Sequence, residues 1–332
     1  MTFAKRYDAY LFDLDGTVWE GGQALPHAQE AITSTKVACY YITNNASRSP
    51  ETVAGMLSDI AIPTKAEQVL TSSQAAVEML AETLEPGAKV LILGAPALRD
   101  LATAAGFEVV DSADTQPAAV LQGHNPETGW AQLSEAALAI RAGARFFATN
   151  LDSSLPTERG LCVGNGSMVK AVEHATGVVP QAAGKPEPTM FHAAAKRAKA
   201  SNALGIGDRL DTDIAGGVAA GMDSLHVLTG VSLEGDLIYA EPLQRPTYVA
   251  TDLRCLEDEV AKYRPHPEGG FSASWEGSDI VLTGGDVDAT ALDALHTVLA
   301  CAWEGEAFDG KVRAEGEAAV AALAQFAHMP AS

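Results

Sequence analysis

Two carboxylates one residue apart follow the first apolar run of the chain. Asp13 and Asp15 belong to the sequence DLDGT, which comes directly after Tyr7–Phe12. The aromatic and aliphatic residues of that run predict a buried β-strand that ends at the acidic turn. At such a strand end one carboxylate can attack a substrate while its neighbour transfers protons. The pattern indicates covalent chemistry on a carboxylate.

Attack of a carboxylate on a phosphate group brings two anions together. Two unit charges about 4 Å apart repel by about 4 kcal/mol at an effective dielectric constant near 20, so the reaction needs a cation. Asp208 and Asp213, in the sequence GDRLDTD, follow another apolar run and offer further oxygen ligands to join Asp13. Because Mg²⁺ is a hard ion that prefers oxygen ligands, we predict a magnesium site at these residues.

Polar residues stand beside strand ends elsewhere in the chain. Thr43 and Asn45 lie in YITNN, and Lys185 lies in GKP. Taken singly, each has an ordinary explanation: Thr43 or Asn45 as a turn former, Lys185 as a surface lysine, and Asp208 or Asp213 as a helix N-cap. Their shared position at strand ends or helix starts favours one common site over these separate explanations.

Strand-like and helix-like segments alternate through most of the chain. A helix is expected from Ser49-Pro50 to about Ser58, because proline favours the first turn of a helix. The strand-like runs after the first are Val37–Thr43, Lys89–Leu93, Ala118–Leu121, Phe146–Thr149, Ala203–Ile206 and Leu225–Leu228. The alternation predicts a doubly wound parallel α/β sheet of the Rossmann-like kind, with its active groups at the carboxyl ends of the strands.

The pattern changes near Tyr263, where the turn-rich sequence RPHPEGG begins. Two strand-like and two helix-like segments follow, namely Phe271–Trp275, Asp279–Leu282, about Ala289–Trp303 and about Glu315–Phe326. We therefore predict a small α+β appendix at residues 265–332.

Composition narrows the classes of function. Of the 332 residues, 47% are hydrophobic, yet no apolar run approaches the about 18 residues that span a bilayer, which argues against a membrane protein. The N-terminal residues do not read as a secretory signal, so we expect a cytoplasmic location. The formal net charge of −21 would repel a nucleic-acid backbone, so nucleic acid is not an expected partner. The four cysteines lie far apart and form no metal-binding motif.

In order, DLDGT, YITNN, GKP and GDRLDTD resemble the four motifs of the haloacid-dehalogenase-type phosphatases, over roughly residues 7–255. The resemblance implies that Asp13 is the nucleophile and a metal ligand. It further implies that Asp15 protonates the leaving alcohol, then activates the hydrolytic water, and ligates magnesium through its backbone carbonyl. Asp208 would ligate the metal, and Asp213 would orient a water molecule held by it.

The same resemblance assigns the phosphate contacts. Thr43, with its neighbours Asn44 and Asn45, would bind the phosphoryl oxygens of the substrate. Lys185 would screen the negative charge of both the phosphate and Asp13. These roles agree with the electrostatic stabilisation that an oxygen-rich transition state requires.

The spacing of the motifs indicates where a cap domain is inserted. Residues 16–42, between the first two motifs, are too few for a helical cap, whereas residues 44–184 separate Thr43 from Lys185. We predict a discontinuous core domain at residues 1–72 and 181–262, with an α/β cap inserted at residues 73–180. This arrangement resembles the class IIA subgroup, which includes phosphoglycolate, glycerol 3-phosphate, nucleotide and para-nitrophenyl phosphatases.

A large cap restricts access, so the expected substrate is a small phosphorylated metabolite. Within the subgroup, glycerol 3-phosphate is the first expectation, and 2-phosphoglycolate or another sugar or nucleotide monophosphate is the alternative. His124, Asn150, Asp152 and Arg159 are polar residues of the cap that could face the substrate. The subgroup contains cap-mediated dimers, which suggests a homodimer.

Other classes of function fit the sequence less well or stay open. A catalytically silent regulatory protein could sense a phosphometabolite, with the appendix as its interaction module, but intact catalytic motifs argue against it. A phosphotransferase with the same aspartyl phosphate stays open, because access of water decides the acceptor. A calcium-binding EF-hand is excluded because Leu210 and Thr212 occupy would-be ligand positions of its loop. A P-loop nucleotide binder is excluded because no P-loop sequence is present.

Overall fold

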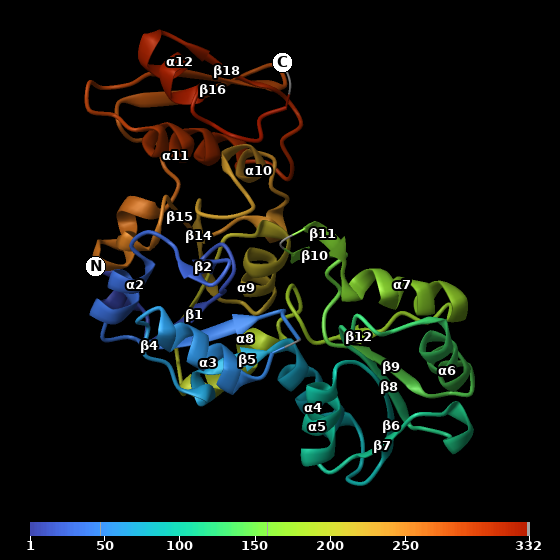
Figure 1. Cartoon of the computed structure of the whole chain (residues 1–332). Helices are drawn as coiled ribbons and strands as arrows, with labels where there is room; N and C mark the ends of the chain where they lie inside the picture. The colour runs from blue at the N-terminus through green and yellow to red at the C-terminus, as the bar shows by residue number, and fades with distance from the viewer. Residues whose placement is uncertain (47, 158, 331–332) are drawn as a thin grey trace. The chain divides into compact units, whose positions relative to one another are not determined.

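The computed structural model describes residues 1–46, 48–157 and 159–330, and the chain divides into two compact units (Figure 1). Unit 1 comprises Met1–Tyr40, Ser58–Pro63 and Ala198–Ser332. Unit 2 comprises Tyr41–Leu57 and Thr64–Arg197. Among the residues so described, no helix combines the length and the apolar character needed to cross a membrane.

A six-stranded sheet with the strand order β15-β14-β13-β1-β4-β5 confirms the predicted parallel α/β fold. The strands of this sheet that lie wholly in unit 1 are β1 (Ala9–Phe12), β13 (Ala203–Gly207), β14 (Asp223–Val227) and β15 (Tyr248–Ala250). β13 pairs in parallel with β1 and with β14, and β14 pairs in parallel with β15. β4 (Ala38–Thr43) begins in unit 1 and ends in unit 2, where it pairs in parallel with β5 (Val69–Thr71). Every residue of β1 and β13 is buried, as expected for strands covered on both faces.

The register between β1 and β13 sets the position of two predicted site residues. Phe12 pairs with Ile206, so the two strands end at nearly the same level. Asp13 follows β1 directly, and Asp208 follows β13 directly. Since the strands are parallel neighbours, both carboxylates lie at the same edge of the sheet.

Short helices flank the strands of unit 1 that precede the C-terminal appendix. Those of α-helical type are α1 (Phe3–Arg6), α2 (Ala28–Ser34), α9 (Ala215–Ala219) and α10 (Glu234–Ile238). A π-helical turn, η3 (Leu210–Ile214), precedes α9 and carries Asp213. The remaining short elements are the β2–β3 hairpin (Trp19–Glu20 and Gln23–Ala24) and the 3₁₀ turns η4 (Pro242–Gln244), η5 (Leu253–Glu257) and η6 (Val260–Tyr263).

The C-terminal appendix forms the predicted α+β arrangement within unit 1. Its three-stranded sheet contains β16 (Phe271–Glu276), β17 (Asp279–Gly284) and β18 (Val312–Glu315), and its helices are α11 (Ala291–Ala302) and α12 (Glu317–Leu323). β16 and β17 form an antiparallel hairpin, and β18, which the sequence did not predict, adds in parallel to β17. Thr290 starts α11 with a capping box, because its hydroxyl accepts from Asp293 N while the Asp293 carboxylate accepts from Thr290 N.

One hydrophobic cluster joins the appendix to the preceding part of unit 1. Leu295 and Val298 of α11 pack in the same cluster as Leu210 and Ile214 of η3 and Leu237 of α10. All five side chains are 4% exposed or less. The appendix therefore shares its core with the π-helical turn that carries Asp213.

Unit 2 contains a second parallel sheet with the order β12-β9-β8-β6-β7. Its strands are β6 (Lys89–Leu93), β7 (Glu108–Val110), β8 (Ala119–Gln122), β9 (Arg145–Ala148) and β12 (Gln181–Ala182). The helices that lie wholly or mainly in this unit are α3 (Pro50–Asp59), α4 (Ser72–Thr83), α5 (Pro96–Ala104), α6 (Trp130–Arg141), α7 (Asn165–Thr176) and α8 (Thr189–Ala198), with 3₁₀ turns η1 (Ala66–Gln68) and η2 (Ala113–Thr115). An antiparallel hairpin, β10 (Ser154–Thr157) and β11 (Gly160–Val163), precedes α7.

The core of the second sheet is aliphatic. Leu91 and Val120 from the strands pack with Ile140 of α6 and Val169 of α7. Unit 2 contains all of the predicted cap, residues 73–180, together with flanking segments that we assigned to the core domain. The domain boundaries drawn from the sequence stay a prediction.

Candidate active site

Three buried carboxylates meet at the carboxyl ends of β1 and β13. Asp13, Asp208 and Asp213 are 9%, 0% and 4% exposed, and each offers an oxygen that lies within 4.8 Å of the others. The backbone N–H of Asp13 donates to Ile206 O at 2.8 Å, which fixes the start of the turn to the neighbouring strand. Like charges held this close in a buried place repel one another, and an all-oxygen donor set suits a hard cation. The three residues therefore fit a magnesium ion.

Asp208 is oriented by hydrogen bonds to both of its carboxylate oxygens. Thr17 Oγ1 donates to Oδ1 at 3.0 Å, and Val231 N donates to Oδ2 at 2.8 Å. Gly16 has a φ of +88°, and a Cβ atom there would lie 2.5 Å from Asp208 Oδ2. Both the backbone conformation and the close approach require glycine in the DLDGT turn.

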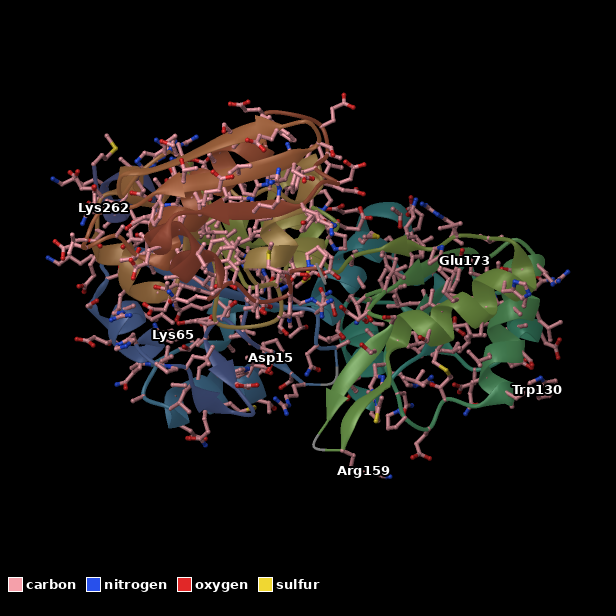
Figure 2. The ribbon with its side chains drawn as sticks, turned by 90° about the horizontal axis from the view of Figure 1, so that it is seen from above. Asp15, Lys65, Trp130, Arg159, Glu173 and Lys262 are labelled. Atoms are coloured by element: carbon pink, nitrogen blue, oxygen red, sulfur yellow. The ribbon has the colours of Figure 1, made fainter. Side chains whose placement is uncertain are left out.

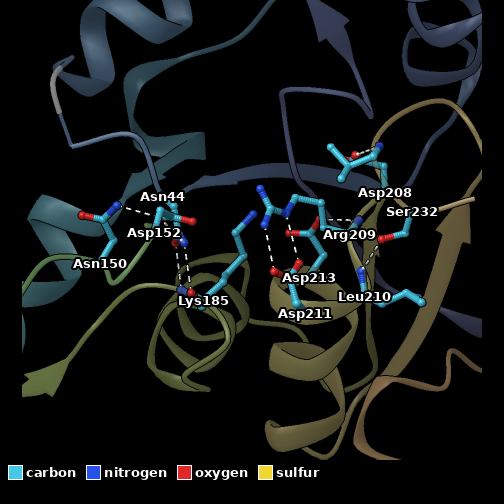
Figure 3. A network of polar contacts seen from close by, with 11 residues as sticks. Asn44, Asn150, Asp152, Lys185, Asp208, Arg209, Leu210, Asp211, Asp213 and Ser232 are labelled. Atoms are coloured by element: carbon cyan, nitrogen blue, oxygen red, sulfur yellow. Dashed lines mark hydrogen bonds and ion pairs between the residues drawn. The ribbon is translucent and has the colours of Figure 1, made fainter. Parts of the chain in front are cut away.

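Asp213 is held within η3, where its Oδ2 accepts from Arg209 N at 3.1 Å. The Arg209 guanidinium binds the neighbouring Asp211 through two nitrogens, as Figure 3 shows. The N-cap positions of η3 and α9 belong to Arg209 and Ile214. The alternative that Asp208 or Asp213 serves as a helix N-cap is therefore wrong.

Asp15 differs from Asp13 in its exposure to solvent. Its side chain is exposed, and its Oδ1 accepts from the indole N–H of Trp19 at 2.9 Å. Trp19 itself is only 2% exposed, so the donor is fixed in place by packing. A carboxyl group that is oriented on one side and open to solvent on the other is suited to exchange protons with water.

In unit 2, Asn44 and Lys185 form a reciprocal pair. Lys185 N donates to Asn44 Oδ1 at 2.8 Å, and Asn44 Nδ2 donates to Lys185 O at 2.9 Å. Lys185 Nζ donates to Ile42 O at 3.3 Å, and the residue is only 3% exposed. The alternative of an ordinary surface lysine is therefore wrong, because an ammonium group this buried needs anionic or dipolar partners.

The turn after β4 is fixed by side-chain hydrogen bonds. Thr43, 4% exposed, accepts at its hydroxyl from Asn45 N at 3.1 Å. Ser72, at the start of α4, donates from its hydroxyl to Asn44 O at 2.8 Å. This turn thus has the local order that a phosphate-binding segment needs.

Two of the candidate cap residues join this polar group. Asp152 Oδ2 accepts from Asn44 Nδ2 at 3.0 Å and from Asn150 Nδ2 at 2.6 Å, as Figure 3 shows. His124 instead lines a cavity of about 110 Å³ with Gln122 and other residues. Arg159 is exposed and lies at the tip of the β10–β11 hairpin (Figure 2).

Sequence reasoning missed several residues that orient the predicted ones. Thr17 and Val231 bind the Asp208 carboxylate, and Ser72 binds the backbone oxygen of Asn44. A signal existed for two of them: Thr17 is the last residue of DLDGT, and Val231 follows a predicted strand that ends at Thr229-Gly230. The chemical roles of Asp13, Asp15, Thr43, Lys185 and the other site residues stay predictions.

Comparison with protein families gives two matches. The family described as haloacid dehalogenase-like hydrolase matches residues 10–108, and a family described as HAD-hydrolase-like matches residues 182–256. These two segments contain the residues of all four sequence motifs.

Two curated relatives are phosphatases. The chain is 43% identical over 339 residues to D-glycerol 3-phosphate phosphatase of Mycobacterium tuberculosis, which covers 99% of this chain and 96% of the relative. It is 36% identical over 263 residues to acid sugar phosphatase of Staphylococcus saprophyticus, which covers 78% of this chain and 100% of the relative.

Two solved structures give the same picture. The glycerol phosphate phosphatase of Mycobacterium tuberculosis in complex with magnesium superposes with a TM-score of 0.94 at 42% identity, over 99% of each chain. A thermostable NPPase from Geobacillus stearothermophilus superposes with a TM-score of 0.69 at 34% identity, over 76% of this chain and 98% of that chain.

Proposed function

Because this chain, a phosphatase, belongs to the haloacid dehalogenase-like hydrolases, we propose that glycerol 3-phosphate is its substrate and magnesium its cofactor. The predicted family and enzyme class are confirmed, and the alternative of a catalytically silent binding protein is not supported. The observation that carries the proposal is the group of three buried carboxylates at the strand ends, with a fourth carboxylate two residues after Asp13.

The substrate proposal is supported by the extent of the match. The relative named D-glycerol 3-phosphate phosphatase matches 99% of this chain, whereas the acid sugar phosphatase matches 78%. A three-carbon phosphomonoester is also consistent with a small-molecule site. We further propose, from the sequence, a cytoplasmic homodimer with no nucleic-acid or membrane partner.

The proposed reaction has two displacement steps at phosphorus. The Asp13 carboxylate attacks the phosphorus atom, the bond to the ester oxygen breaks, and Asp15 gives its proton to the departing glycerol oxygen. Water then attacks the phosphorus of the aspartyl phosphate while Asp15 accepts a proton from it. Inorganic phosphate leaves, and Asp13 returns to its starting state.

The remaining site residues act on charge. Thr43, Asn44, Asn45 and Lys185 bind the phosphoryl oxygens, and their donors stabilise the negative charge in the transition state. Asp13, Asp208, Asp213 and the backbone carbonyl of Asp15 would hold magnesium. When bound, this ion supplies the positive charge that allows one anion to approach another.

A substrate panel tests this function. Phosphate release should be measured with each enantiomer of glycerol 3-phosphate, 2-phosphoglycolate, pyridoxal phosphate, nucleoside monophosphates, sugar phosphates and para-nitrophenyl phosphate, with magnesium and with a chelator. We expect one glycerol 3-phosphate enantiomer to give a kcat/KM at least about tenfold above the other compounds, and the chelator to stop its hydrolysis. A clear preference for another compound would replace the proposed substrate. Transfer of the phosphoryl group from para-nitrophenyl phosphate to added glycerol, in place of water, would indicate a phosphotransferase.

Magnesium is expected to stabilise the folded chain. The three buried carboxylates repel one another without a cation, so magnesium should bind the folded chain and not the unfolded one. At 100 times its dissociation constant, magnesium should then add about 2.7 kcal/mol to the free energy of unfolding. Calorimetric melting with and without magnesium measures the shift. Asp208→Asn should abolish it, whereas Asp211→Asn should retain it, because the Asp211 side chain is 57% exposed and binds Arg209. A shift of equal size in Asp208→Asn would place the ion elsewhere.

A further inference from the structure

A short loop holds Asp208 by its backbone as well as by its side chain. Residues 229–232, here named the clamp loop, follow β14 and precede α10. Within it Val231 N donates to Asp208 Oδ2 at 2.8 Å, and Ser232 N donates to Asp208 O at 3.0 Å. The clamp loop therefore fixes both the carboxylate and the peptide group of this candidate metal ligand.

The side chain of Ser232 also binds Leu210, two positions after Asp208. Its Oγ accepts from Leu210 N at 3.2 Å, as Figure 3 shows. Ser232 thus bonds on both sides of Arg209, to Asp208 and to the first residue of η3. Since η3 also carries Asp213, one serine joins the segments that bear two of the three clustered carboxylates.

The clamp loop also lies too close to Asp208 to tolerate a side chain at its centre. A Cβ atom on Gly230 would lie 2.1 Å from Asp208 Oδ2. Thr229 Oγ1 donates to Gly16 O at 2.6 Å, which ties the loop to the DLDGT turn as well. A displacement of the loop would consequently move the Asp208 carboxylate or its hydrogen-bond donors.

His226 fixes the clamp loop from the adjacent strand. It is 0% exposed, and its Nε2 lies 2.9 Å from Ser232 O. Because a carbonyl oxygen only accepts, Nε2 must carry the hydrogen, and Nδ1 is then an acceptor that has no hydrogen-bond partner among the described residues. Burial lowers the pKa of His226 to about 4, so the ring is neutral near pH 7 and acts as a donor through Nε2.

We propose that Ser232 and His226 are positioning residues that hold Asp208 in the orientation required for magnesium binding. The inference rests on the proposed magnesium site. Neither residue touches the substrate in this proposal, and both act through the clamp loop. Outer-shell partners of this kind set the orientation of a ligand before the ion arrives, and their loss typically weakens metal affinity by about 10- to 100-fold.

A matched pair of serine substitutions separates positioning from general packing. Ser224 lies on β14, two residues before His226, is 0% exposed, and its hydroxyl has no hydrogen-bond partner among the residues described. Ser232→Ala and Ser224→Ala therefore remove the same atom from buried places in one region. Only Ser232→Ala removes a hydrogen bond near Asp208.

The test is magnesium binding by isothermal titration calorimetry on the full chain without substrate, together with the melting temperature in chelator. We expect Ser232→Ala and His226→Leu to weaken magnesium affinity at least about tenfold, and Ser224→Ala to leave it unchanged. His226→Gln should recover much of the affinity, because its amide N–H can replace the Nε2 donor. Activity at saturating magnesium should recover toward the wild-type value in Ser232→Ala.

Each other outcome overturns the proposal in a distinct way. If Ser232→Ala and His226→Leu bind magnesium as tightly as the wild type and only melt at a lower temperature, the two residues are purely structural. If Ser224→Ala weakens binding as much as Ser232→Ala, the effect comes from packing in this region. If the wild-type chain itself binds no magnesium, the proposed magnesium site fails, and this inference fails with it.

Discussion

Asp13→Asn is expected to lower phosphate release by at least about a thousandfold while the chain stays folded. Asn has nearly the same shape as Asp, and the backbone N–H of residue 13 can still donate to Ile206 O. The amide cannot form the aspartyl phosphate, however, because it is a far weaker nucleophile than a carboxylate. Steady-state phosphate release with magnesium and circular dichroism of the purified variant measure the two parts of this prediction.

Two further variants sharpen that result. Asp211→Asn makes the same chemical change at a side chain that is 57% exposed, and it should keep kcat within about twofold of the wild type. Asp13→Ala excludes activity that would arise if the introduced amide were deamidated back to a carboxylate. Substantial turnover in both Asp13 variants would rule out covalent catalysis on this residue.

The local features of the site could be predicted from the sequence because they depend on neighbouring residues. Short apolar runs such as Lys89–Leu93 and Ala203–Ile206 predict buried strands, and the structure contains strands β6 and β13 at these places. Since parallel strands bring their carboxyl ends together, the meeting of Asp13 and Asp208 also follows from the strand pattern.

The hydrogen bonds that orient the site could not be predicted in the same way. The reciprocal pair of Asn44 and Lys185 joins residues that are 141 positions apart, and Ser232 reaches back 22 positions to Leu210. Such contacts depend on how the chain packs in three dimensions, and no periodicity of the sequence encodes them. Only turn signals, such as Thr229-Gly230 after a strand, mark where they occur.

The appendix shows the same limit at the level of packing. Its hairpin and two helices follow from residue patterns, but β18 (Val312–Glu315) alternates between half-exposed and exposed residues and so gives no clear strand signal. Nor does the sequence indicate that Leu210 and Ile214 share a core with Leu295 of α11. The appendix is therefore integrated with the rest of unit 1.

Asp15→Asn is expected to slow formation of the aspartyl phosphate from glycerol 3-phosphate far more than its formation from para-nitrophenyl phosphate. Glycerol leaves as an alkoxide that needs a proton, so loss of the acid should reduce its release by about 100- to 10,000-fold. Para-nitrophenolate leaves without a proton, so formation of the aspartyl phosphate should be largely spared with that substrate. Breakdown of the intermediate still needs a base to activate water, so it should become rate-limiting.

This difference gives a kinetic signature that a simple loss of folding cannot imitate. With para-nitrophenyl phosphate, stopped-flow absorbance of Asp15→Asn should show a burst of nitrophenolate equal to the enzyme concentration, followed by a slow steady rate. Glu20→Gln makes the same carboxyl-to-amide change at an exposed residue of β2, and it should behave like the wild type. Equal losses with both substrates and no burst would mean that Asp15 does not act as the acid and base, because those two roles affect the two steps separately.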